Sequence, residues 1–529
     1  MKRSKWIKLV AIVAAFCLFA CGCGGNTQQE KPADYNATGL PIVDEPVTLR
    51  VLTTRWYSLG DSFTSNQWLI DLEKRTNVHI EWIVYSLTDW GEQKGILLSG
   101  GDLPDIVLGC STFTDVDILT NTSYFHDFTD LIDKYMPNLK AAMEEKPEMR
   151  KICTYEDGKI YSLPAVLPLR STVTNQPVIN MQWLKNLGLS VPRTLEELEQ
   201  VFYAFRDGDP NGNGDPNDEY AISGAGGLPP DLLTPFGITD QSGTHMMLDE
   251  NNEWVFYPIQ ENYKQALKWL NKMYVEGCID PEMFTQDLTM LNGKRRNEEA
   301  PQIGFDYAWT PDANFGGKWA SQYEIIPSIV GPDGKAYATG DPDGVNYLTR
   351  NQALITTDCV NPEIAARWLD EFYTGEASIQ NTWGDFNTAF TVKDGKYYLN
   401  APPEGQSADS WYWTNSMRNF GPKYTSDDFY EKIILDPQSG DGLKQEAAKL
   451  AEPYVTIPYP MVMFTAEEAE RISELSTDIE RIVANTCASF VSRGNIDKAW
   501  DSYVNRLKKA GVEELISIYR TACDRYSQE

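Results

Sequence analysis

The chain has 529 residues, of which 42% are hydrophobic and 12% aromatic, so it can form two or more lobes with substantial cores. Asp and Glu outnumber Lys and Arg by 76 to 46, which gives a formal net charge of −30. This balance argues against nucleic-acid binding and against binding to anionic lipid by charge alone, because both need clustered positive charge. The three histidines are far apart in the sequence, and no His/Cys cluster indicates a zinc site.

The N-terminus has the pattern of a secretory signal peptide. Residues 1–8 read MKRSKWIK, and the apolar run at 9–19 is too short to span a bilayer. The run ends in Leu-Phe-Ala-Cys, which resembles a bacterial lipobox, so we expect residues 1–20 to be removed and Cys21 to be lipidated. An ordinary signal peptide cleaved near Ala20, or lipidation at Cys23, is the alternative.

Small and polar residues follow the lipobox, in the sequence GCGGNTQQEKPADYN. They predict a flexible tether within residues 21–44. No later stretch of the sequence is long and apolar enough for a membrane helix. We therefore expect a folded body held at the extracytoplasmic face of a bacterial cell membrane by its lipid anchor alone.

Beyond the tether, strand and helix patterns alternate. Strands are predicted at 47–53, 79–84 and 105–108 from their β-branched or alternating residues. Helices are predicted between them at 66–75 and 90–98, where apolar residues fall near helical spacing. This alternation is typical of a parallel sheet with helical crossovers.

The segment DGDPNGNGDPNDEY at 207–220 has the spacing of a calcium loop. Counted from Asp209, oxygen-bearing side chains occupy positions 1, 3, 5, 7 and 9, and Gly214 occupies position 6, where an EF-hand loop turns sharply. Position 12 is Tyr220, so the last carboxylate must come from one of the two acids before it. The candidate ligands of a structural Ca²⁺ are Asp209, Asn211, Asn213, Asp215, Asn217, Asp218 and Glu219. A solvated turn without a metal is the alternative.

The alternation returns later in the chain. Strands are predicted at 303–308, 323–327 and 352–356, and a helix at 361–373 with Asn361 as its N-cap. From Thr465 the chain is predicted to be mostly helical, with a capping box at the start. Six cysteines lie in the body, widely spaced and mostly on apolar segments, and we expect them to be mostly free, buried thiols rather than disulfides.

Four segments, in this order, resemble the extracellular solute-binding proteins of bacterial ABC importers. They are ILLSGGDLPDI at 96–106, DGKIYSLP at 157–164, WLKNLGL with PRTLEEL at 183–198, and the closing YRTACDRY at 519–526. The resemblance is closest to the long lipoprotein subgroup that includes LipO and the alginate-oligosaccharide-binding proteins. That subgroup often has a basic residue just before the WL helix, whereas this chain has Asn180-Met181-Gln182 there, which leaves the charge of the ligand open.

The resemblance implies a periplasmic-binding-protein-like type II fold: two α/β lobes with a ligand cleft between them and a helical C-terminal region. The implied first lobe comprises residues 45–165 and 346–398. The implied second lobe comprises residues 166–345, with the calcium-like loop, and residues 399–529. Such proteins are expected to be monomers that perform no catalysis, close on a solute and deliver it to permease subunits.

Aromatic side chains are the candidate ligand contacts, because sugars stack on flat aromatic faces. Trp309 closes the strand at 303–308 and resembles the binding tryptophan of maltose-type relatives, and Trp56 follows the first strand. The full candidate set is Trp309, Trp56, Tyr57, Trp383, Trp411 and Trp413, with Arg55 and Arg170 as donors to a carboxylate or hydroxyls. Each tryptophan has core or surface packing as its alternative, and each arginine a surface ion pair.

These features predict an oligosaccharide-binding lipoprotein of an ABC importer. The same scaffold binding a peptide or an acidic small solute is the second hypothesis, and it requires a charged cleft rather than stacked aromatic rings. An exported glycoside hydrolase is a third hypothesis from another class. It requires two facing carboxylates, and no recognised catalytic motif is present in the sequence.

Overall fold

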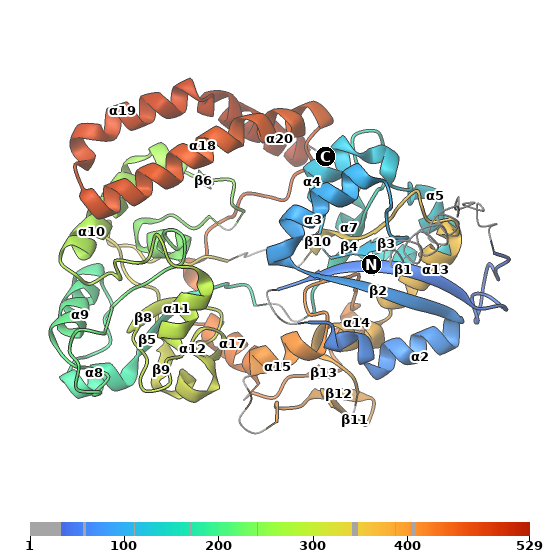
Figure 1. Ribbon diagram of the computed structural model, residues 1–529, viewed down its shortest axis with the longest axis horizontal. Helices are drawn as coiled ribbons and strands as arrows, with labels where there is room; N and C mark the ends of the chain where they lie inside the picture. The colour runs from blue at the N-terminus through green and yellow to red at the C-terminus, as the bar shows by residue number, and fades with distance from the viewer. Residues whose placement is uncertain are drawn as a thin grey trace, which may run out of the picture.

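The computed structural model describes residues 33–56, 60–109, 112–168, 171–240, 242–340, 348–386, 388–403, 406, 408–437 and 439–528. The chain forms two α/β lobes that lie side by side, and long C-terminal helices run from one lobe to the other (Figure 1). The α/β class and the helical C-terminal region are as predicted. The signal peptide, Cys21, Tyr57, Cys110 and Arg170 lie outside the described residues.

The first lobe is built on a five-stranded sheet with the order β2-β1-β3-β10-β4. Its strands are β1 (Val47–Arg55), β2 (Val78–Ser86), β3 (Ile106–Leu108), β4 (Leu163–Val166) and β10 (Leu348–Ile355). β1 pairs in parallel with β2 and β3, as the alternation of strands and helices predicts. β10 enters from beyond the second lobe and pairs antiparallel with β3 and β4.

Helices cover this sheet and bury its apolar residues. They are α2 (Gln67–Thr76), α3 (Leu87–Gly100), α4 (Asp115–Thr120), α5 (Thr129–Tyr135), α6 (Pro137–Glu145), α7 (Glu148–Lys151), α13 (Pro362–Asp370) and α14 (Gly375–Trp383). Trp68 and Trp368 lie in the core that the sheet and helices share, consistent with their place on apolar helix stripes. The predicted helix at 361–373 is α13 followed by a 3₁₀ turn. Asn361 occupies the N-cap position, but its side chain accepts from the Ala33 amide instead of capping α13.

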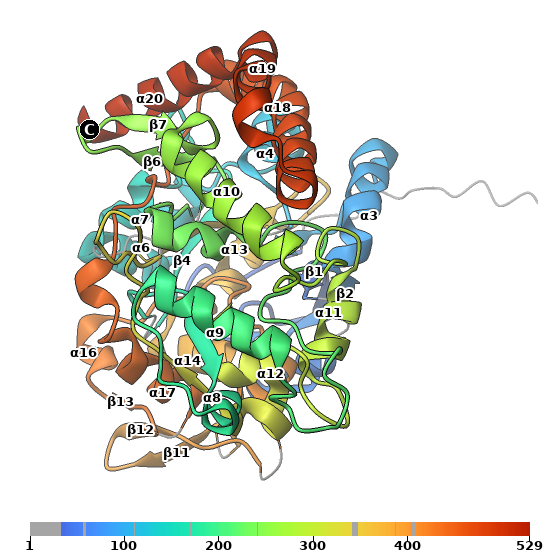
Figure 2. The same ribbon diagram turned by 90° about the vertical axis from the view of Figure 1, so that its left-hand side faces the viewer.

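The second lobe has a three-stranded antiparallel sheet with the order β8-β5-β9. Its elements are β5 (Gln176–Asn180), α8 (Met181–Leu187), α9 (Leu195–Asp207), β6 (Met246–Leu248), β7 (Trp254–Phe256), α10 (Glu261–Val275), α11 (Leu288–Arg295), β8 (Phe305–Ala308), α12 (Pro311–Trp319) and β9 (Tyr323–Ile325). Figure 2 shows α8, α9 and α10 on the outer face of this lobe. The strands predicted at 303–308 and 323–327 are confirmed as β8 and β9.

A small sheet follows α14 and forms its own core. Its elements are β11 (Phe390–Lys393), β12 (Lys396–Leu399), α15 (Ala408–Asn415), α16 (Asp427–Tyr430), β13 (Ile433–Ile434) and α17 (Gly440–Ala448). Residues of α14, β11, β12, α15 and β13 share one hydrophobic cluster. Apolar side chains of β13 and α15 are thus buried with those of α14, which follows α13 of the first lobe, whereas the sequence predicts a return to the second lobe at residue 399.

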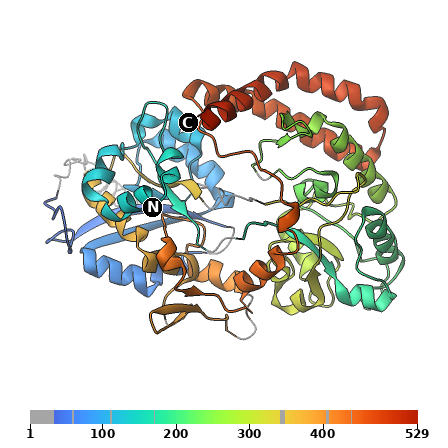
Figure 3. The ribbon, with the colours of Figure 1, turned by 180° about the vertical axis from the view of Figure 1, so that it is seen from behind.

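The C-terminal helices join the two lobes. They are α18 (Ala466–Arg493), α19 (Ile496–Lys509) and α20 (Val512–Gln528), and α18 begins with the predicted capping box of Thr465 and Glu468. Apolar residues of all three helices belong to the core of the second lobe, while α18 also contacts α4 of the first lobe. Figure 3 shows from behind how these helices reach across. In the described part of the chain, no helix is both long and apolar enough to cross a membrane.

The cysteines of the described residues are free and buried: Cys153, Cys278, Cys359, Cys487 and Cys523. This confirms the expectation of free, buried thiols for these five. Burial raises the pKa of Cys278 and of Cys487 to about 11, so their thiolates are scarce at neutral pH.

We expect these five thiols to be unreactive toward Ellman's reagent in the native protein and to react once guanidinium exposes them, because the thiolate is the reacting form. The protein should be purified without reductant, so that any native disulfide survives. In a chain that begins after residue 36 and so has six cysteines, Cys110 included, fewer than six titrated thiols after denaturation would show that some of them are paired.

Candidate ligand-binding site

Three aromatic rings gather where β1 ends in the first lobe. The ring centroids of Trp56 and Trp413 are 6.4 Å apart with the planes at 88°, and Phe420 lies 6.4 Å from Trp56 and 6.3 Å from Trp413. Trp56 is 40% exposed and Trp413 is half-buried, whereas Phe420 is buried. The structure thus brings together two tryptophans that the sequence places 357 positions apart, and Trp56 presents part of its ring to solvent.

Arg55 supports this group from beneath and is 1% exposed. Its guanidinium donates to the Ser416 carbonyl oxygen at 2.6 Å and to the Trp413 carbonyl oxygen, both at the C-terminal end of α15. A cation is favourable there because the last carbonyls of a helix lack partners within the helix. Burial lowers the pKa of Arg55 to about 10, so it remains charged at neutral pH. The structure thus places the Arg55 side chain beneath the aromatic group, where it holds the end of α15.

Lys423 plays a similar part for Phe420. It is fully buried and donates through Nζ to the carbonyl oxygens of Phe420 at 2.8 Å and Gly421 at 3.1 Å. Gly109, directly after β3, packs against the Phe420 ring so closely that a Cβ atom would lie 2.6 Å from Cδ1. Gly109 also has φ of +102°, so any other residue there is strained and clashes with the ring.

Trp309 lies in the second lobe, one residue beyond β8. The register pairs Ala308 with Gln176 at the start of β5, which brings Trp309 level with the segment by which the chain enters this lobe. The Lys444 ammonium lies over the half-buried indole, 4.7 Å from its centroid. Trp309 precedes α12, and α12 contacts α15, which carries Trp413. The α12–α15 contact thus joins the helix that follows Trp309 to the helix that carries Trp413, and Figure 1 shows α15 between the lobes.

Polar groups accompany Trp309. The Asn175 amide donates to the Asp231 carboxylate at 2.9 Å, and both side chains are half-buried. Burial raises the pKa of Asp231, while the hydrogen bond from Asn175 and the positive charge of Lys444 act in the opposite direction. A carboxylate and an amide beside an indole are the groups that commonly bind sugar hydroxyls.

Three predicted tryptophans occupy different environments from those expected. Trp383 ends α14 and is 1% exposed, with its indole nitrogen donating to Asp441 at 2.6 Å, so it is a core residue and not an accessible one. Trp411 and Trp413 lie in helix α15 and not in an irregular segment. Trp411 packs against the small core while Trp413 lies beside Trp56, because side chains two positions apart project from different sides of a helix.

The calcium-like loop folds around Asp209. Its two carboxylate oxygens accept from the amides of Gly212 at 2.9 Å and Gly214 at 3.0 Å. The side-chain oxygens of Asn211, Asn213 and Asp215 each accept from the amide two residues further on. Alternate side chains thus organise the loop, as the spacing predicts.

Glu219 ends the loop and is 5% exposed. Neither carboxylate oxygen has a hydrogen-bond partner among the described residues. Burial, followed by the nearby charge of Asp218, raises the pKa of Glu219 to about 7. A buried carboxylate without a donor costs free energy unless a cation compensates it, so the residues fit a hard cation with oxygen ligands. Within the described residues, no cluster built only from His, Cys, Asp and Glu could hold a metal, and several of the donors predicted here are asparagines.

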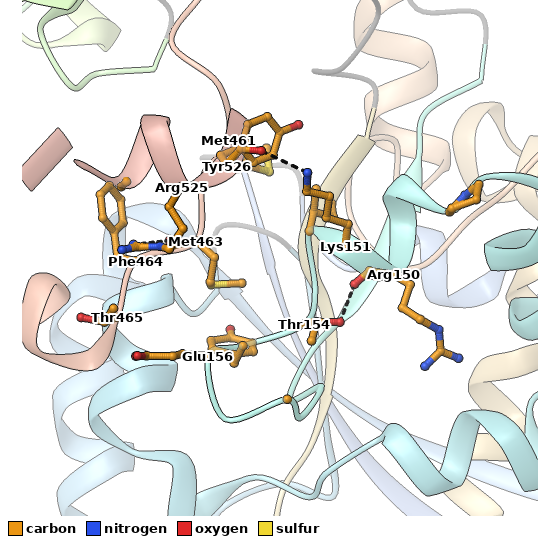
Figure 4. Close-up of a pocket in the computed structure, with 15 residues that line it drawn as sticks. Arg150, Lys151, Thr154, Glu156, Met461, Met463, Phe464, Thr465, Arg525 and Tyr526 are labelled. Carbon is orange, nitrogen blue, oxygen red and sulfur yellow. Dashed lines mark hydrogen bonds between the residues drawn. The ribbon is translucent and has the colours of Figure 1, made fainter. Parts of the chain in front are cut away.

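A cavity of about 590 Å³ lies elsewhere at the lobe junction, between α7, the segment before α18 and the end of α20 (Figure 4). Lys151 donates to the Tyr526 carbonyl oxygen at 3.1 Å, and Arg525 pairs with Glu468 at 2.6 Å. Arg150 points away from the other labelled side chains (Figure 4). No aromatic residue predicted for the ligand lines this cavity, so we place the candidate site at Trp56, Trp413 and Trp309.

The chain is similar to a known binding protein over nearly its whole length. The fructooligosaccharide ABC transporter substrate-binding protein FusA of Streptococcus pneumoniae serotype 4 (strain ATCC BAA-334 / TIGR4) is 29% identical over 546 residues, covering 99% of each chain. The structure of FusA in complex with kestose matches with a TM-score of 0.79, over 91% of this chain and 99% of FusA. The chain is thus similar, in both sequence and fold, to an ABC-transporter substrate-binding protein. No family model matches the chain.

Other relatives of this chain extend the comparison. Lipoprotein LipO of Bacillus subtilis (strain 168) is 23% identical over 469 residues, which cover 84% of this chain and 86% of LipO. The alginate-binding protein AlgQ2, solved without calcium ion, shares the fold at 20% identity, with a TM-score of 0.72 over 93% of this chain and 100% of AlgQ2. The resemblance to the subgroup of LipO and the alginate-binding proteins is confirmed. FusA is a substrate-binding protein and matches 99% of this chain, which bears out the expectation of a protein without catalysis.

Sequence reasoning did not select Phe420, Lys444, Lys423, Asn175 or Asp231. A lysine in the segment GLKQEAAKL is expected at the surface, and only the packing shows that Lys444 is buried. Asn175 follows the first crossover into the second lobe, and this position in the sequence was the one feature that could have indicated a place near the ligand site.

We expect Arg55→Met to destabilise the protein by about 2–3 kcal/mol, because it leaves buried carbonyl oxygens of α15 without their charged donor. The measurement is guanidinium unfolding followed by circular dichroism. Arg75→Met on α2 is the matched control, since its ion pair with Glu371 is exposed and worth little. Equal stability of the two variants would contradict the supporting role of Arg55.

Proposed function

We propose that this protein captures a neutral oligosaccharide outside the cell and delivers it to the permease of an ABC importer. The observation that carries the proposal is the exposed ring of Trp56 beside Trp413, across the α12–α15 contact from Trp309. Indole faces stack on the C–H surfaces of sugars, and the neighbouring polar groups can receive hydroxyl hydrogen bonds. FusA, crystallised with kestose, is similar over the whole length of the chain, which supports a fructooligosaccharide as the ligand.

The groups of the site favour a neutral solute over an acidic one. Arg55 is buried and donates to main-chain carbonyls, so it does not present its charge to a ligand. Asn175 and Asp231 are joined by a hydrogen bond near the start of β5, and neither supplies a positive charge for a carboxylate ligand. A peptide or an acidic small solute therefore remains the second candidate, with weaker support.

Binding is proposed to draw the two lobes together around the sugar. Trp56 and Trp413 stack on it from the first lobe, and Trp309 contacts it from the second. Neither lobe alone offers all three rings, so the bound sugar stabilises the arrangement in which both lobes contact it. Release to the permease then requires that the lobes separate again. The chain itself supplies binding and orientation.

The remaining structural assignments belong to the same proposal. The return of β10 into the sheet order β2-β1-β3-β10-β4 supports a type II binding-protein fold. The first lobe is proposed to comprise residues 45–165 and 346 to about 437, and the second the rest of the body. The lipobox sequence and the similarity to LipO support anchoring through Cys21 at the extracytoplasmic face of the membrane.

A structural calcium ion in the 209–219 loop is also proposed. A FusA structure of an EF-hand mutant in complex with fructo-nystose matches this chain with 28% identity and a TM-score of 0.80, which shows that such a loop exists in a similar protein. Asp209, Asn211, Asn213, Asp215 and Glu219 would hold the ion, which supplies the positive charge that the buried Glu219 carboxylate lacks. The loop follows α9 directly, so the ion would fix it to that helix.

Thermal unfolding with a panel of kestose, longer fructooligosaccharides, uronic-acid oligosaccharides, peptides and small acids tests the ligand class. A ligand at about 100 times its dissociation constant stabilises the native state by about 2.7 kcal/mol. We expect the neutral fructooligosaccharides to raise Tm, and Trp56→Ala to weaken their binding about tenfold, the equivalent of one lost aromatic contact. Tyr398→Ala removes a similarly exposed ring on the small sheet and should leave binding unchanged. A shift with peptides or acids alone would contradict the proposal.

Calcium is expected to raise Tm of the wild-type protein, and a chelator to reverse the shift. Glu219→Gln should abolish the response without lowering the stability of the calcium-free protein, because it removes an uncompensated buried carboxylate. Glu250→Gln, an exposed acid of the same lobe, is the control and should respond as the wild type does. An identical calcium response in Glu219→Gln would show that the ion does not use this loop.

A further inference from the structure

Lys444 is an unusual lysine because its charge is buried. It lies on α17 with 1% of its surface exposed, and it donates through Nζ to the Gln176 side-chain oxygen at 2.9 Å and to the Thr174 carbonyl oxygen. Lysine is rarely buried, because the ammonium loses its hydration and needs compensating contacts. The third contact is the indole of Trp309, 4.7 Å away. A desolvated cation over an indole face is held more strongly than an exposed one.

The contacts of Lys444 converge on the start of β5. Gln176 pairs with Ala308 across the sheet, and Trp309 is the next residue of that strand's extension. Gln176 is itself oriented, since its side-chain nitrogen donates to the Ala447 carbonyl oxygen of α17 at 2.9 Å. The ammonium therefore lies in a fixed place relative to β5 and covers one side of the Trp309 ring.

α17 carries a second buried group, Asp441, on the same part of its surface. Asp441, one turn before Lys444, accepts from the Trp383 indole nitrogen at 2.6 Å and pairs with Arg418 at 3.2 Å. Trp383 belongs to the small core beside the first lobe, whereas Gln176 and Trp309 belong to the second. Since residues three apart lie on neighbouring parts of one helix face, α17 links the first-lobe side to Trp309 through buried polar contacts.

We infer that Lys444 is a positioning residue for ligand binding: it fixes the orientation of Trp309 from α17, so that a sugar stacks on the side of the indole that Lys444 does not cover. The inference rests on the proposed function, because it identifies a residue that affects the affinity of the proposed ligand site. Lys444 acts through Trp309 and does not itself touch the sugar. Trp309 presented in one orientation requires no reordering when the ligand binds, and this lowers the entropic cost of binding.

The test is a double-mutant cycle on ligand affinity. Kestose, or whichever sugar of the panel binds the wild type most tightly, is titrated by calorimetry into the wild type, Lys444→Met, Trp309→Phe and the double variant. We expect Lys444→Met to weaken binding about tenfold, the size of one desolvated cation–π contact. In the Trp309→Phe background the same change should alter affinity less than about twofold, because coupled residues are non-additive.

Tryptophan fluorescence reports on the environment of Trp309 separately from the overall stability of the protein. The emission of Trp309 is obtained as the difference between each protein and its Trp309→Phe counterpart. This emission should shift and become more accessible to acrylamide in Lys444→Met. Lys449→Met, on an exposed lysine at the end of the same helix, is the matched control and should change neither readout. Lys444→Gln serves if the Met variant is too unstable to purify.

The outcomes separate the two claims. The positioning role is overturned if the wild type binds a sugar and Lys444→Met binds it equally well. It is also overturned if Lys444→Met lowers the affinity by the same factor with Trp309 and with Phe at position 309. Either result leaves the proposed function intact. A wild type that binds no sugar overturns both. Loss of affinity in Lys444→Met that disappears in the Trp309→Phe background, together with the change in Trp309 emission, supports the inference.

Discussion

Buried cations that donate to main-chain carbonyl oxygens hold the aromatic residues between the lobes. Arg55 binds the carbonyl of Trp413, Lys423 binds that of Phe420, and Lys444 binds the carbonyl of Thr174 while lying over Trp309. An exposed indole on a loop or helix end would otherwise sample several orientations, and fixing it on binding costs conformational entropy. A charged donor in a dry environment makes stronger hydrogen bonds than a neutral one, so a few such contacts suffice to fix the rings before the ligand arrives.

Contacts of α17, of the C-terminal helices and of β10 connect the lobes in the described part of the chain. α17 joins the small core to β5 through Asp441 and Lys444, and the C-terminal helices lie in the core of the second lobe while their ends reach the first. Arg350 on β10 donates to the Val462 carbonyl oxygen at 2.7 Å just before α18 begins. A movement of one lobe against the other would have to preserve or break these buried polar contacts.

Local patterns predicted much of this architecture, because burial of an apolar face leaves a period in the sequence. The strands at 47–53 and 303–308, the capping box at Thr465 and the turn spacing of the 209–219 loop were all visible. The sequence did not show in which direction a side chain points within a segment rich in aromatic residues. Trp411, Tyr412 and Trp413 are consecutive aromatic residues that cover several sides of α15, so they obscure its helical period. Trp383 and Arg55 looked accessible, and buried Lys444 looked like a surface lysine, because their burial depends on segments far away in the chain.

A crystal structure of the protein with a bound fructooligosaccharide would show directly whether aromatic rings from both lobes bind one sugar. We expect a single sugar chain to contact Trp56 or Trp413 of the first lobe and also Trp309 of the second, with Lys444 on the side of Trp309 away from the sugar. A sugar bound only in the cavity beside Lys151 and Tyr526, or on one lobe without contact to the other, would contradict this binding mode.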